Sequence, residues 1–155
     1  MEYKFLTERG GNTFYPVTVE KINEAEEALG IVFPQDLKDF YLEVGYGFIE
    51  GSENNINRIM GPYSVRDFRL RQNDFEFQPN IDIYNGFEEG RLYFYEVNES
   101  AFMSMGFGED KYNAIYYYDV QIASSLKEFL QKMQDNDEYY HALVDAAWGI
   151  GPEDI

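Results

Sequence analysis

The alternation of apolar and polar residues is clearest between residues 18 and 48, where it predicts two helices. Apolar side chains of the first helix recur at spacings of three and four, with glutamates on the opposite face. Thr18 stands at the N-cap position, and Gly30 supplies the left-handed conformation that ends a helix. Pro34 then begins the second helix. The apolar positions of the two helices are Val19, Ile22, Ala25 and Leu29, followed by Leu37, Phe40, Tyr41 and Val44.

Beyond residue 51 the pattern changes to short apolar runs separated by turn residues, which is typical of an antiparallel sheet. A short helix or a turn is predicted at residues 64–71. Ser125 and Glu128 form a capping box that begins a C-terminal helix, and Asp137 is expected to cap a last one. The predicted strands are residues 57–61, 81–84, 92–97, 101–105 and 114–118, together with a small hairpin formed by residues 3–6 and 13–17.

This order of elements predicts a single α+β domain that spans residues 1–155. We expect a mostly antiparallel sheet of about five to six strands, with N-terminal and C-terminal helices covering one of its faces. A chain of 155 residues can bury a sufficient core without a metal ion or disulfide.

The chain is strongly acidic, because 29 Asp and Glu against 12 Lys and Arg give a formal net charge of −17. Such a field repels phosphate backbones and anionic lipids, so neither nucleic acid nor a membrane is an expected partner. A basic protein would be attracted, unless the acidity serves only solubility. The 14 Tyr and 13 Phe favour a half-exposed binding surface or, alternatively, simply fill strand positions.

The sequence offers little for catalysis or metal binding. His141 is the only His and Cys is absent, which excludes a Cys–His pair and a two-His metal site. Adjacent acidic residues such as Glu88 and Glu89 fall in predicted turns or on solvent-exposed helix faces, where their pKa values would not be driven apart. We therefore expect no catalytic residue, no metal, no cofactor and no enzymatic activity.

Three further features favour a cytoplasmic location. The chain has no Cys, no apolar run long enough to span a membrane, and no secretory signal pattern in its first residues.

The helix–glycine–proline–helix segment resembles the N-terminal signature of the SUKH superfamily. This superfamily includes bacterial polymorphic-toxin immunity proteins and yeast regulators of glucan synthesis. The likeness continues through residues 57–68 and the predicted strands, and it spans residues 17–134. The matching residues of the signature are Ile22, Glu26, Leu29, Gly30, Phe33, Pro34, Leu37, Phe40, Tyr41 and Gly47.

The resemblance implies an immunity protein that neutralises a cognate toxin in a stoichiometric complex, the toxin being a nuclease or a nucleic-acid deaminase. Enzymes that act on polyanions tend to carry basic grooves, which an acidic protein can cover. Aromatic side chains would anchor such a complex, and carboxylates would speed the encounter. The candidate contact residues are Glu50, Glu53, Asp74, Glu76, Glu88, Glu89, Glu109 and Asp110, with Tyr46 and Tyr84 as anchors.

Two other functions stay open at this point. The yeast relatives suggest a regulatory adaptor that binds several proteins, and the many aromatic residues allow a small-ligand-binding module. The oligomeric state is left open as well.

Overall fold

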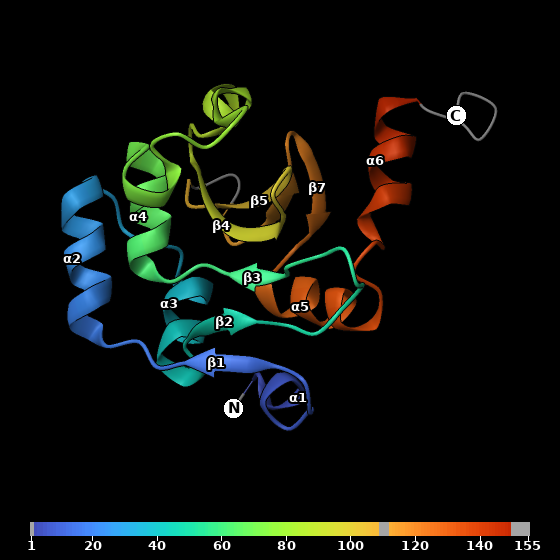
Figure 1. The fold of residues 1–155 in the computed structure, drawn as a ribbon, viewed down its shortest axis with the longest axis horizontal. Coiled ribbons are helices and arrows are strands. Elements are labelled where there is room, and N and C mark those ends of the chain that lie inside the picture. Colours follow the sequence, from blue (N-terminus) through green and yellow to red (C-terminus); the bar gives the residue numbers. More distant parts are fainter. Residues whose placement is uncertain (1, 109–111, 150–155) are drawn as a thin grey trace.

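The computed structural model describes residues 2–108 and 112–149, and in this part of the chain seven strands form one antiparallel sheet (Figure 1). Each strand pairs with the next one along the sequence. The predicted α+β class is confirmed, and the sheet has one or two strands more than expected. The strands are β1 (Thr13–Tyr15), β2 (Tyr46–Phe48), β3 (Arg58–Ile59), β4 (Arg91–Asn98), β5 (Ala101–Gly106), β6 (Ile115–Tyr117) and β7 (Val120–Ala123).

Most of the helices come before the long central strands β4 and β5 in the sequence, and two follow the last strand. In Figure 1, α2 and α4 lie side by side, and α6 stands at the other side of the molecule. The helices are α1 (Lys4–Thr7), α2 (Val19–Leu29), α3 (Gln35–Glu43), α4 (Pro62–Leu70), α5 (Leu126–Asp135) and α6 (Tyr140–Trp148), with two 3₁₀ helices, η1 (Asn73–Phe75) and η2 (Ile81–Phe87).

The two N-terminal helices form for the local reasons that the sequence indicated. Thr18 Oγ1 accepts a hydrogen bond from the N–H of Lys21, so the predicted N-cap is confirmed. Gly30 has φ 67° and ends α2 in the left-handed conformation. The Glu26 carboxylate then accepts a hydrogen bond from the N–H of Phe33 at 2.7 Å, which holds the turn into α3.

The central strands β4 and β5 are covered on both faces, whereas helices on one face were expected. On one side the Phe68 ring of α4 packs against Tyr93 of β4, with ring centroids 5.1 Å apart. On the other side the Phe129 ring of α5 lies 4.9 Å from Tyr95 of β4 in an edge-on arrangement. Because β5 is covered on both faces, every one of its residues is buried. A strand in this position lacks the apolar–polar alternation of a half-exposed strand.

The predicted hairpin between residues 3–6 and 13–17 is wrong. The N–H groups of Glu2 and Tyr3 donate to the Glu43 carboxylate at the end of α3, and residues 4–7 become helix α1. Strand β1 pairs instead with β2, which is distant in sequence. Gly47 permits this pairing because a Cβ at that position would come 2.0 Å from the carbonyl oxygen of Thr13.

The strand predicted at residues 81–84 is also wrong, because this segment begins the 3₁₀ helix η2. Ile81 and Tyr84 are both buried, while Ile83 between them is 49% exposed. Inward side chains three positions apart fit a helical turn and not a strand, whose side chains alternate.

The prediction that Asp137 caps α6 is wrong, because its side chain instead holds the loop between β2 and β3. Its carboxylate accepts hydrogen bonds from the N–H and hydroxyl of Ser52 and from the side-chain amides of Asn55 and Asn57. In Figure 1 this loop reaches the junction of α5 and α6. The group of Ser52, Asn55, Asn57 and Asp137 is called the Asp137 corner below.

Within residues 2–108 and 112–149, none of the helices combines the length and the apolar character needed to cross a membrane.

Candidate partner-binding surface

The turn between β4 and β5, formed by Glu99 and Ser100, is held between two loops. From one side, Asn98 donates through its side-chain amide to the Asn55 side chain at 3.2 Å. From the other side, the Gln78 amide donates to the carbonyl of Glu99 at 3.3 Å. The segment around η1 and η2 is therefore brought against the end of the central hairpin.

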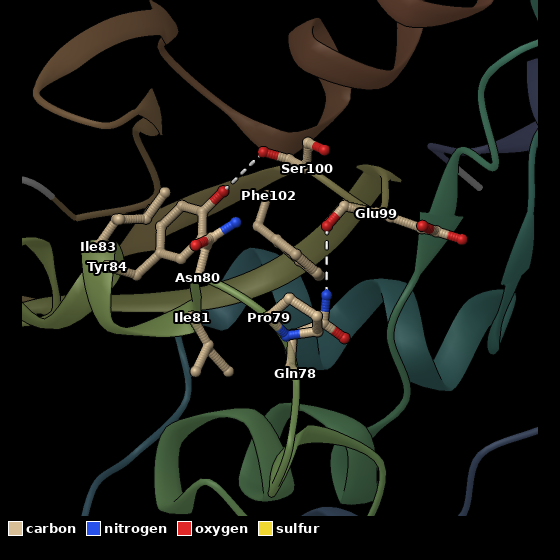
Figure 2. A pocket seen from close by; sticks show the side chains of 9 residues that line it. All are labelled: Gln78, Pro79, Asn80, Ile81, Ile83, Tyr84, Glu99, Ser100 and Phe102. Atoms are coloured by element: carbon tan, nitrogen blue, oxygen red, sulfur yellow. Dashed lines mark hydrogen bonds between the residues drawn. The ribbon is translucent and has the colours of Figure 1, made fainter.

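A cleft of about 270 Å³ opens between this segment and the turn (Figure 2). Its floor is formed by the rings of Tyr84 and Phe102, which belong to the buried core. The hydroxyl of Tyr84 donates to the carbonyl of Ser100 at 3.1 Å and fixes the ring. The lining residues are Gln78, Pro79, Asn80, Ile81, Ile83, Tyr84, Glu99, Ser100 and Phe102.

Phe77 directly precedes the lining residue Gln78 and is the most exposed large apolar side chain of the described residues, at 86% of its full surface. The neighbouring Phe75 is buried and packs edge-on against Phe68, with ring centroids 5.1 Å apart. Phe75 thus anchors the segment in the core and leaves Phe77 in solvent. Sequence reasoning missed Phe77, although the run Asp-Phe-Glu-Phe at residues 74–77 placed two phenylalanines among carboxylates.

The electrostatics of this segment are one-sided. Residues 72–90 contain five carboxylates and neither Lys nor Arg. The carboxylates of Asp74, Glu76 and Asp82 form no hydrogen bond and no ion pair with any of the described residues. The same holds for the carboxylate of Glu99 across the cleft. These four groups are free to meet a cation from outside.

Three of the predicted acidic contact residues lie in loops that lead to lining residues of this cleft or of a neighbouring depression. Asp74 and Glu76 flank Phe75 and precede Phe77, in the segment that leads to Gln78 at the cleft. Glu53 is exposed in the loop that leads to Asn54, which lines a second depression together with Glu99. Glu53, Asp74 and Glu76 therefore lie in the two loops that flank one turn.

Of the remaining acidic candidates, the three that the structure describes are absent from the lining of the cleft. Glu50 is exposed, and its N–H donates to Asn12 near the N-terminus. Glu88 is largely covered and forms an ion pair with Arg71, while Glu89 is exposed in the turn before β4. Glu109 and Asp110 lie outside the described residues.

Neither predicted aromatic anchor is a free ring. Tyr84 is only 2% exposed, because Phe102 and other aromatic side chains surround it, so its prediction as an exposed anchor is wrong. Tyr46 is half-buried, with its ring centroid 5.3 Å from that of Tyr15. Phe77 is the residue that has the exposure expected of an anchor.

The carboxyl groups with perturbed pKa values serve the fold. Burial raises the pKa of Asp36 against the opposing hydrogen bond from the N–H of Leu126, through which Asp36 begins α5. Burial likewise raises the pKa of Glu96, and the adjacent Arg58 guanidinium opposes this shift. Both carboxylates hold elements together and lie apart from the cleft lining.

The described residues contain no cluster of three or more His, Asp or Glu side chains arranged to hold a metal ion. His141 is exposed and stacks beside Tyr140, with ring centroids 4.5 Å apart. The arrangement at the cleft, apolar floor and unpaired carboxylates, is suited to binding a polypeptide.

Comparison with known proteins finds one family and one similar protein. Residues 16–132 match the sequence profile of the SMI1/KNR4 family (SUKH-1). The chain is 56% identical over 145 residues to a Bacillus subtilis (strain 168) protein named immunity protein YxxD, an alignment that covers 94% of this chain and 99% of that protein. No solved structure matches the chain.

Proposed function

The chain belongs to the SMI1/KNR4 family (SUKH-1), and from this premise we propose that it is an immunity protein that binds and neutralises a cognate toxin domain. The single observation that carries the proposal is the 56% identity to an immunity protein over almost the full length of both chains. The relative's name supports the role of an immunity protein for this chain, and it does not name a toxin.

We further propose that the toxin is a basic protein, either a nuclease or a nucleic-acid deaminase, and that the complex forms in the cytoplasm. A net charge of −17 supports a basic partner, because the negative field accelerates association with a basic protein. The same field repels nucleic acid itself. The chain acts in this scheme by occupying or distorting the toxin surface, without turning over a substrate.

The test uses the toxin domain encoded by the neighbouring reading frame. Its activity on nucleic acid should fall linearly as this protein is added and should reach zero at one equivalent, as for a tight complex. An unrelated acidic protein of similar net charge is the matched control and should leave the activity unchanged.

Two results would contradict the proposal. One is a toxin domain that stays fully active at a large excess of this protein. The other is a pull-down from the native host that recovers several regulatory proteins and no toxin, which would favour the adaptor function.

A further inference from the structure

We infer that the cleft and the exposed Phe77 together form the docking site for a basic segment of the partner protein. This inference rests on the proposed function, because it names where the toxin domain binds. We call the site the Phe77 face. It consists of Ile83 and Glu99, which line the cleft of Figure 2, and of the residues Asp74, Glu76, Phe77 and Asp82 from the same segment of the chain as the lining residues 78–84.

The first argument is the exposure of apolar side chains beside a hollow. Phe77 is 86% exposed, and Ile83 on the cleft wall is half-exposed. A single exposed apolar residue is ordinary, but here Ile83 lines a cleft with an aromatic floor and Phe77 directly precedes the lining residue Gln78. Phe77 is available to enter a pocket of the partner, and the cleft is available to receive a partner side chain, which is the arrangement found at binding hot spots.

The second argument is that the cleft is already formed. Tyr84 and Phe102 are held by the core, and hydrogen bonds from Tyr84 to Ser100 and from Gln78 to Glu99 span the cleft. Binding would therefore cost little ordering of the floor, which favours affinity.

The third argument is charge, and it identifies the occupant. The carboxylates of Asp74, Glu76 and Asp82 lie in a segment without any Lys or Arg. Their mutual repulsion is relieved by cations from outside, and the same field excludes an anionic ligand. The geometry points to a partner segment that carries Lys or Arg next to an apolar side chain.

The experiment measures the dissociation constant for an inactive variant of the toxin domain encoded by the neighbouring reading frame. Phe77→Ala should weaken binding about 30-fold, the effect of losing one hot-spot residue. The double variant Asp74→Lys with Glu76→Lys should slow association about tenfold or more at low salt, and it should reduce the salt dependence of the rate.

The matched control is Glu20→Lys with Glu27→Lys, which makes the same change in net charge on the exposed face of α2. It should change the dissociation constant by less than about threefold if the location of the charge matters. Thermal unfolding of every variant shows whether it is folded, and the surface position of Asp74 and Glu76 keeps the test valid if Phe77→Ala is unstable.

The outcomes separate the two proposals. If the wild-type protein neither binds nor inhibits the toxin domain, the proposed function fails. If it inhibits, but the Phe77 and Asp74–Glu76 variants bind as tightly and as fast as the wild type, the function stands and the docking site is overturned.

Discussion

Two acidic regions of this protein use their carboxylates in opposite ways. In the Asp137 corner, a 5% exposed carboxylate accepts hydrogen bonds from Ser52, Asn55 and Asn57, at 2.7 Å from the Ser52 N–H and 2.8 Å from the Asn57 amide. On the Phe77 face, Asp74 and Glu76 stand in solvent and have no partner among the described residues. Net charge alone does not separate these roles.

The difference shows what each carboxylate contributes. A buried carboxylate that satisfies several donors ties distant segments together, because those donors would otherwise be left without partners. An exposed and unpaired carboxylate contributes little to folding and keeps its field available for association. We therefore expect substitutions in the Asp137 corner to change stability and substitutions on the Phe77 face to change binding.

Asp137→Ala should give the largest change in stability. It removes the acceptor for four donors from the loop between β2 and β3, and we expect a loss of about 3 kcal/mol in the free energy of unfolding. Urea unfolding measures this loss. Glu138→Ala, at the exposed neighbouring position, is the control and should stay within about 0.5 kcal/mol. Equal stability of the two variants would show that the hydrogen bonds of the Asp137 corner do not stabilise the fold.

The pH dependence of this difference should be the second effect. Burial acts to raise the pKa of Asp137, but the hydrogen bonds from Ser52, Asn55 and Asn57 lower it to about 2, below its ordinary value of 3.8. A pKa that is lower in the folded state adds stability above pH 3.8, and this contribution is lost as the pH falls toward 2.

The stability gap between the wild type and Asp137→Ala should therefore narrow as the pH falls from about 4 to about 2. Chemical unfolding at a series of pH values measures the gap. A constant gap over this range would show that the Asp137 carboxylate is not held in its charged form by the corner.

The smallest effect on stability is expected on the Phe77 face. Phe77→Ala removes a ring that is 86% exposed, so the free energy of unfolding should stay within about 0.5 kcal/mol of the wild type. Phe75→Ala, two positions away, removes a buried ring and is the opposing control, expected to cost about 3 kcal/mol. If Phe77→Ala destabilised the protein as much as Phe75→Ala, the ring would have to be a part of the core.

Several parts of the fold could be read from short-range patterns. The caps at Thr18 and Gly30 were confirmed, as was Ser125, whose hydroxyl accepts from the N–H of Glu128. Strands β4 and β5 lie where the apolar runs placed them. Each of these signals depends on residues within about four positions, where hydrogen bonding and side-chain spacing are local.

The candidate site was predicted only in part. Asp74 and Glu76 were chosen for their charge and are exposed in the segment that leads to the cleft, but Tyr84 was chosen as an anchor and is buried. The exposure of an aromatic residue is decided by what packs over it. The rings that cover Tyr84 are those of Phe68, Phe102 and Tyr118, which come from three segments distant in sequence. Phe77 was missed for the same reason, since only the burial of Phe75 leaves it outside.

The sequence by itself determined the main helices, the central hairpin, the acidity and the family signature, because these depend on residue types and short spacings. Tertiary structure decided that β1 pairs with β2, that residues 81–87 form a 3₁₀ helix, and that Asp137 binds a loop some 80 residues away. It also decided which carboxylates stay exposed and unpaired. Such outcomes depend on contacts between distant segments, whose register and burial are set only when the whole core packs.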